Sequence, residues 1–143
     1  MPPALIAALF FTLALFVVTA YSIMGSLPLL ILKHDTPMDS RFVRGFFNTY
    51  CIAALWTASA TAACYAFAGR TGYAAGAAAL ALLAYSLRRV LVSKMDSLSA
   101  EILRGNAKAV AGFRRMHVTA VSANAVQLVL IVWGLIALSM QLR

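Results

Sequence analysis

The sequence has few charged residues and very few acidic ones. Of its 143 residues 11% are charged, and four are Asp or Glu. We expect all four to lie in loops, which leaves no carboxylate inside an apolar segment. Ionisable residues inside a membrane are typical of ion and proton pathways, so their absence argues against a carboxylate-based pump. The four residues are Asp35, Asp39, Asp96 and Glu101.

Common catalytic and metal-binding motifs are also missing. The sequence contains no nucleotide-binding glycine loop, no HExxH and no GxSxG. It has two cysteines but no CxxC or Cys/His cluster of the kind that holds structural zinc. Cys51 and Cys64 fall thirteen residues apart in one predicted helix, which places them about 20 Å apart. An intramolecular disulfide needs Cα atoms within about 7 Å, so we expect two buried thiols.

Apolar residues make up most of the chain. They account for 63% of it, and the mean hydropathy is +0.87, whereas a soluble domain is about half apolar and about a quarter charged. A helix needs about 20 apolar residues to cross a bilayer. We therefore predict one all-α integral membrane domain, an up-down-up-down bundle of four transmembrane helices over residues 4–24, 46–67, 73–92 and 116–140.

Local signals suggest how the spans begin, end and pack. The sequence Gly25-Ser26-Leu27-Pro28 predicts a kink or break after the first span, because proline removes a backbone donor. Asp39 or Ser40 is expected to cap the second helix. Gly72 and Gly76 form a GxxxG spacing in an alanine-rich helix. This spacing predicts that the helix packs closely against another, within the bundle or in an oligomer.

Residues 93–112 form the longest polar stretch, between the third and fourth spans. Leu98, Ile102 and Leu103 give it a short amphipathic pattern, and Glu101 and Arg104 form an i,i+3 charge pair. We expect an amphipathic cytoplasmic helix that lies on the membrane or extends beyond it.

Basic residues give the chain a formal charge of +8. With four spans, ten of them fall on the side of the first and third loops and two on the other. The positive-inside rule then predicts that both termini lie outside the cytoplasm, and we expect a bacterial inner (plasma) membrane. The basic loops would meet anionic lipid headgroups. No basic domain lies outside the spans, so nucleic acid is not an expected partner.

Three polar residues stand out in the last span. His117, Asn124 and Gln127 lie near one face of the predicted helix, over about 15 Å. Polar groups in a membrane normally face the bundle interior or a water-filled cavity. Plausible partners on the other spans are Asn48, Tyr50 and Tyr85, and these six residues are our pocket candidates.

Two interpretations of this polar stripe stay open. In the first, it forms a polar pocket that opens toward the cytoplasm, with His117 as a proton carrier or as a metal or haem ligand. Alternatively, its amides hold helices together and His117 sits in a helix interface. His34 is a loop residue beside Asp35. The two histidines could meet as metal ligands, but nothing in their spacing requires it.

The order of features resembles the anthrone oxygenase-like family and related four-helix membrane domains of unknown function. The matching residues are Phe113, Arg115, His117, Ser122 and Asn124, together with the break after the first span and the aromatic start of the second. The resemblance implies a four-helix bundle and oxidative chemistry on an aromatic or quinone-like substrate.

The function favoured by the sequence is binding of a hydrophobic small molecule, lipid or cofactor in a polar intramembrane pocket. One alternative is a membrane oxidoreductase that uses His117, with haem or a quinone as the cofactor. Another is an accessory subunit or homo-oligomeric scaffold of a larger membrane complex.

Overall fold

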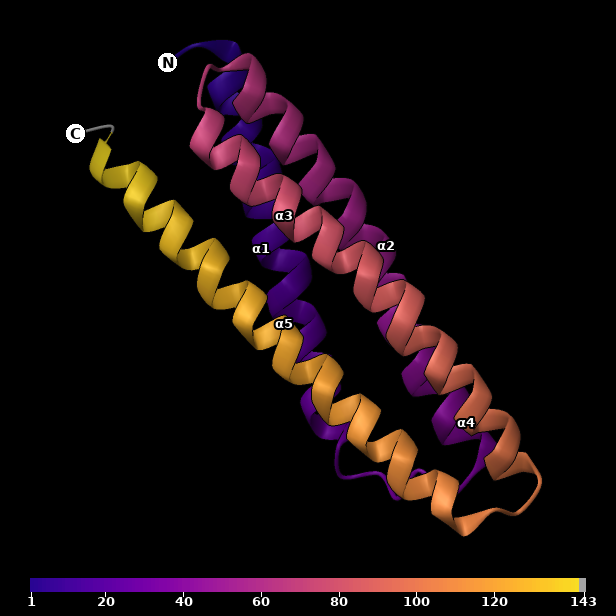
Figure 1. Ribbon diagram of the computed structural model, residues 1–143. Coiled ribbons are helices and arrows are strands. Elements are labelled where there is room, and N and C mark those ends of the chain that lie inside the picture. The colour runs from indigo at the N-terminus through magenta and orange to yellow at the C-terminus, as the bar shows by residue number, and fades with distance from the viewer. Residues whose placement is uncertain (142–143) are drawn as a thin grey trace.

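The computed structural model describes residues 1–141, which form a bundle of long helices (Figure 1). Three of the four long helices are uninterrupted α-helices. The fourth consists of two α-helices joined by a π-helical turn. The elements are α1 (Pro3–Leu29), α2 (Pro37–Phe67), α3 (Thr71–Leu87), the π-helical turn η1 (Arg88–Val92), α4 (Ser93–Leu103) and α5 (Ala107–Gln141). Because α3, η1 and α4 are continuous, the chain makes four long passes.

All four passes are long and apolar enough to cross a membrane. The protein is therefore an all-α, four-span helical membrane protein, as predicted. Successive passes alternate in direction, so both ends of the described chain lie at one end of the bundle (Figure 1). We call this the terminal end. The opposite loop end carries residues 30–36 and the turn before α5.

The buried face of α1 is more polar than its outer face. Large apolar side chains such as Phe10, Val17 and Met24 are exposed and suited to contact lipid. The buried positions are separated alternately by three and four residues, which is the spacing of left-handed helix bundles. Four of the seven carry hydroxyl groups, in the series Leu5, Ala8, Thr12, Leu15, Thr19, Ser22 and Ser26.

The helices do not pack equally against each other. Helix α2 packs along both α1 and α3, whereas α5 packs mainly on α1 and, through its first half, on α4. Helices α3 and α5 barely touch. Small residues on α3, Ala77, Ala81 and Ala84, are buried and allow its close approach to the bundle.

Two predicted helix boundaries are wrong. Helix α1 continues through Gly25–Pro28 and ends at Leu29, since a proline in the last turn removes only one hydrogen bond near an end that already lacks partners. Helix α2 is capped by Thr36, whose hydroxyl oxygen accepts the Asp39 N–H at 3.2 Å, with Pro37 in its first turn. The predicted cap residues lie inside the helix.

Charged residues at the loop end also differ from prediction. Asp39, Asp96 and Glu101 lie in helices, not loops, although all are at the loop end. Asp96 forms a two-pronged ion pair with Arg44, at 2.6 and 2.9 Å, which joins α4 to α2. Glu101 accepts a hydrogen bond from Asn106 instead of pairing with Arg104. The amphipathic segment therefore extends α3 as a helix held against the bundle.

The GxxxG glycines of α3 do not form a helix contact within the chain. Gly72 and Gly76 are exposed, and a β-carbon built on either would meet no atom within 4 Å. Their packing in an oligomer stays a prediction. Within the chain they instead line an open groove.

Candidate functional site

Polar side chains of α5 point into the bundle. His117, Asn124 and Gln127 are at most 2% exposed. Each lies opposite a polar residue from another segment, because α1 presents hydroxyl groups along its buried face and α2 contributes tyrosines to the interior. The structure therefore places the predicted stripe in the interior, away from lipid.

Gln127 is bonded to Tyr50 in the middle of the bundle. The Tyr50 hydroxyl donates to Oε1 of Gln127 at 2.5 Å. The Thr19 hydroxyl lies 3.5 Å from the same tyrosine and donates to the Leu15 carbonyl at 2.8 Å. One side chain from each of α1, α2 and α5 thus meets at this level, which ties three helices together.

Asn124 joins α5 to α1 closer to the loop end. Its Nδ2 donates to the Ser22 hydroxyl oxygen at 3.0 Å. Its Oδ1 is buried without a hydrogen-bond partner. Such contacts are typical of interhelical bonding in membranes.

His117 meets His34 at the loop end. Nε2 of His34 and Nδ1 of His117 are 3.0 Å apart. The ring centres are 5.2 Å apart. This distance exceeds the distance between the nitrogens by about the sum of the two ring radii, so both nitrogens lie near the line that joins the ring centres and face each other nearly head-on. Two nitrogens bound to one metal ion at roughly 2.0 Å would lie about 3.3 Å apart in tetrahedral geometry and about 4 Å apart if they faced each other across the ion, and both distances exceed the observed 3.0 Å. The geometry is that of an N–H···N hydrogen bond.

No set of three metal-ligating side chains forms within residues 1–141. The second ring nitrogens, Nδ1 of His34 and Nε2 of His117, are buried and have no hydrogen-bond partner. His34 is fully buried and His117 is 2% exposed. The pair is therefore enclosed on all sides, with Phe113 packed against His34 at 5.8 Å between ring centres.

Burial lowers the pKa of His34 below its ordinary value of 6.5. The positive charge of Arg114 acts in the same direction, while the nearby Leu32 carbonyl, Asp39 and Asp35 oppose it. Desolvation disfavours the charged imidazole more than these groups favour it. Burial therefore favours the neutral form of His34.

Two of the six pocket candidates lie elsewhere. Asn48 accepts a hydrogen bond from Nε of Arg88 at 3.0 Å, in an exposed position. Tyr85 is 46% exposed, and the Arg89 guanidinium stacks over its ring at 5.9 Å. Neither reaches the interior stripe, because both lie on the outer side of the α2–α3 pair.

A groove of about 530 Å³ opens in the terminal half of the bundle. Its walls come from α3 and α5, which do not pack together there. Glycines open the walls: Gly72 and Gly76 on α3, and Gly134 on α5. A β-carbon on any of the three would meet nothing within 4 Å. Trp133 forms part of the α5 wall.

The floor of the groove carries one buried polar pair. The Thr12 hydroxyl donates to the Ala8 carbonyl at 2.7 Å and lies 3.2 Å from the Tyr65 hydroxyl. A threonine hydroxyl has a single proton. That proton is shared between the Ala8 carbonyl and the Tyr65 oxygen, which accepts it at the longer distance, so the Tyr65 O–H is left to donate to a molecule in the groove.

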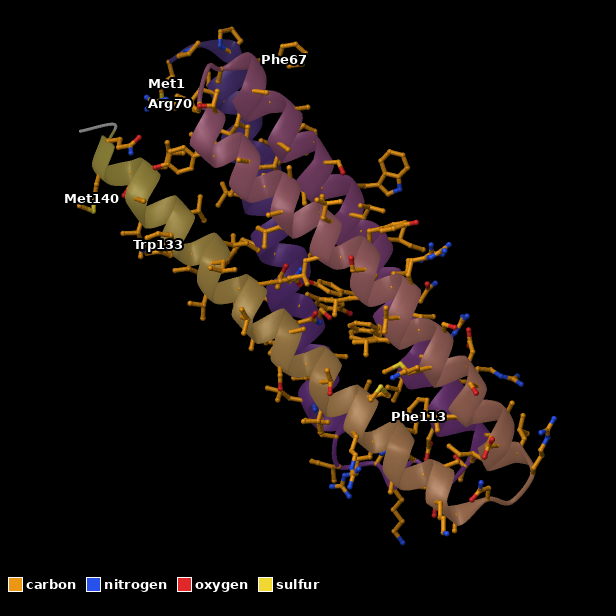
Figure 2. All side chains as sticks on the ribbon, in the orientation of Figure 1. Met1, Phe67, Arg70, Phe113, Trp133 and Met140 are labelled. Carbon is orange, nitrogen blue, oxygen red and sulfur yellow. The ribbon has the colours of Figure 1, made fainter. Side chains whose placement is uncertain are left out.

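The terminal end of the groove is bridged. Nη1 of Arg70 donates to Oε1 of Gln141 at 3.0 Å, which links the start of α3 to the end of α5. Gln141 itself lines the groove. Figure 2 shows Arg70 beside Met1 at the terminal end and Phe113 at the other. The groove and the histidine pair therefore occupy opposite halves of the protein.

Sequence reasoning missed the residues that shape this groove. None of the six pocket candidates lines it. The signal for Thr12 was present in its spacing from Thr19, Ser22 and Ser26 on one face of α1. No pattern in the sequence predicts the groove itself, because the groove depends on the separation of α3 from α5.

Comparison with known proteins adds no assignment. No model of a protein family, no curated protein and no solved structure matches the chain.

Proposed function

We propose that this four-span membrane protein binds a hydrophobic small molecule drawn from the bilayer, in the groove between α3 and α5. The observation that carries the proposal is the groove itself, which lies between two membrane-spanning passes. Its volume falls in the range of roughly 300–1,000 Å³ that is usual for small-molecule sites. Its walls are apolar, as such sites commonly are.

The polar pair on the floor narrows the class of ligand. The Tyr65 hydroxyl can donate one hydrogen bond, and its oxygen can accept one. A largely apolar molecule with a single hydroxyl or carbonyl group would satisfy it. We therefore favour a lipid-like alcohol, acid or ketone with a slender apolar body.

A transmembrane helix from another chain fits the groove less well. A helix with its side chains is about 10 Å wide and would need a channel open along its length. The link between Arg70 and Gln141 closes the terminal end of the groove. A small molecule entering sideways from the lipid needs no such channel.

An oxidoreductase that uses His117 is less well supported. His117 does not line the groove and is enclosed together with His34 at the loop end. A ligand in the groove would lie in the other half of the bundle. Binding is therefore the function that the site geometry favours.

The test uses Trp133 as a reporter. The chain has two tryptophans, and Trp56 lies outside the groove, so Trp56→Phe leaves one reporter in its wall. The purified protein in lipid nanodiscs is titrated with cis-parinaric acid, a fluorescent fatty acid that accepts energy from tryptophan. We expect saturable energy transfer from Trp133.

A pair of glycine substitutions provides the control. Gly76→Leu should fill the groove and abolish the saturable signal without a clash, since its β-carbon meets open space. Gly45→Leu adds the same side chain in equally open space on α2, outside the groove, and should leave the signal unchanged. Equal, unsaturable transfer in all three proteins would show partition into lipid and would contradict the proposal.

A further inference from the structure

His34 is the single buried residue in the middle of an exposed loop. Its neighbours Lys33, Asp35 and Thr36 are exposed, while its own side chain is fully buried. The loop joins α1 to α2, but the imidazole reaches His117 on α5, 83 residues away in the sequence. This one side chain therefore anchors the first loop to the last helix.

The backbone at this anchor adopts an unfavourable conformation. His34 has φ of 60°, in the left-handed region that non-glycine residues seldom occupy. The surrounding contacts must hold it there. Those contacts are the bond to His117 and the packing against Phe113.

The number of protons on the two rings decides whether the bond exists. A neutral imidazole has one N–H and one lone pair. In the neutral pair, one ring donates to the other. After one proton is added, the charged ring still donates to the lone pair of its neighbour. After a second proton is added, each of the two facing nitrogens carries its own N–H, and no acceptor remains for the hydrogen bond.

The charges around the pair act on a second proton in both directions. Arg114 on α5 acts on His34 with the same sign, and the opposing carboxylates are Asp39 in α2 and Asp35 in the loop. Two charged rings at 3.0 Å would repel each other in a site without water access. Exposure of the loop to water would relieve both the repulsion and the desolvation.

We propose that the His34–His117 pair is a proton-binding site that fastens the first loop to α5 and releases it when both rings are charged. The bond that forms is one N–H···N hydrogen bond between the facing nitrogens. The protons that break it come from water on the loop side and return there. By the charge distribution, that side is the cytoplasmic one. The proposal is independent of ligand binding in the groove.

The chain offers a clean measurement, because it has two histidines and both belong to the pair. Protein labelled with [¹⁵N]histidine is titrated by NMR in nanodiscs. We expect a scalar coupling between the facing nitrogens at neutral pH, two linked protonation steps, and loss of the coupling with the second step. Two rings that titrate independently near 6.5, without a coupling, would overturn the proposal.

A second measurement tests whether the pair holds the loop. Trypsin cleavage after Lys33 requires the loop to leave α5, whereas cleavage after the exposed Arg104 does not. At neutral pH we expect His117→Phe, which keeps a ring of similar bulk, to speed cleavage after Lys33 several-fold. Cleavage after Arg104 serves as the internal control.

The matched variant is Val118→Ala, at the neighbouring half-exposed position on α5. It should cleave like the unmodified protein at both sites. If His117→Phe also leaves the rate after Lys33 unchanged, the pair does not fasten the loop and the proposal fails. If both sites become faster together, the helices have loosened as a whole, and a latch at this loop is likewise rejected.

Discussion

Gly25 of α1 lies against the tip of the Phe46 ring of α2. A β-carbon added to Gly25 would be 2.6 Å from Cζ of Phe46 and 3.3 Å from both Cε atoms. Tyr21, one turn earlier on α1, packs against the same ring, with 6.3 Å between ring centres. Close approach of α1 and α2 at the loop end therefore depends on the absence of a side chain at Gly25.

We predict that Gly25→Leu destabilises the protein. Overpacking usually costs about 1–3 kcal/mol, and Phe46 must turn outward to admit the new side chain. Glycine replacement in a helix recovers up to about 1 kcal/mol, so a net loss of up to about 2 kcal/mol is expected. Thermal unfolding in detergent measures it.

The control is Gly45→Leu, which gains the same helix propensity. Its β-carbon meets nothing within 4 Å. It should be neutral or slightly stabilising. A melting curve for Gly25→Leu that matches that of Gly45→Leu would show that the Phe46 ring moves aside freely.

The contrast between these glycines shows what the sequence predicts about the fold. The number of spans follows from hydropathy and length, because a helix is the simplest way to satisfy backbone groups in lipid. Which glycine permits a close contact depends on the rotation of each helix. Gly72 and Gly76 have the GxxxG spacing but face a groove, whereas Gly25 lies three residues before Pro28, in a stretch whose sequence predicts a kink or break.

The candidate site was likewise predictable in part: the sequence indicates which residues of the last span lie in the interior, but not most of their partners. The shared helix face of His117, Asn124 and Gln127 predicts an interior position, and the structure places them there. Their partners were mostly not predictable. Asn48 and Tyr85 differ little in sequence context from Tyr50, yet a rotation of α2 or α3 decides which residue points inward. The burial of the loop residue His34 has no sequence signal, because no periodic pattern exists in a loop.

The bond between Tyr50 and Gln127 should stabilise the bundle measurably. Interhelical bonds in membrane proteins contribute on the order of 1 kcal/mol. Gln127→Leu leaves the buried Tyr50 hydroxyl with Thr19 at 3.5 Å as its remaining neighbour. We predict losses of about 1–2 kcal/mol for Gln127→Leu and for Tyr50→Phe.

A double-mutant cycle isolates the bond. The double variant should lose less than the sum of the single ones, with a coupling of roughly 1 kcal/mol. Thermal unfolding of the four proteins in the same detergent gives the coupling. Fully additive losses would mean that the two side chains stabilise the bundle by packing alone.

The stability of the protein should depend on pH through His34. Its pKa is lowered in the folded state, so the folded protein binds fewer protons than the unfolded chain once the pH falls below about 6.5. The free energy of unfolding should be highest above that value and should fall with acidification, by at most about 1.4 kcal/mol per pH unit for each proton. Denaturant unfolding at a series of pH values measures this slope.

His34→Gln provides the comparison for the pH series. Glutamine does not titrate, so this variant should be less stable at neutral pH and should lose part of the pH slope. An equal slope in both proteins would assign the acid sensitivity to other groups.

The orientation in the membrane is the last prediction. Ten of the twelve basic residues lie toward the loop end, and the other two are Arg70, at the terminal end, and Arg143, outside the described residues. The ten are Lys33, Arg41, Arg44, Arg88, Arg89, Lys94, Arg104, Lys108, Arg114 and Arg115. Basic residues stay in the cytoplasm because their translocation is disfavoured.

Alkaline phosphatase fused after Arg143 should therefore be active, and green fluorescent protein fused at the same place should be dark. The same reporters inserted at Gly105, in the turn at the loop end, should give the reverse pattern. A fluorescent fusion after Arg143 would place the terminal end in the cytoplasm, and the pH that the histidine pair meets would then be that of the opposite side.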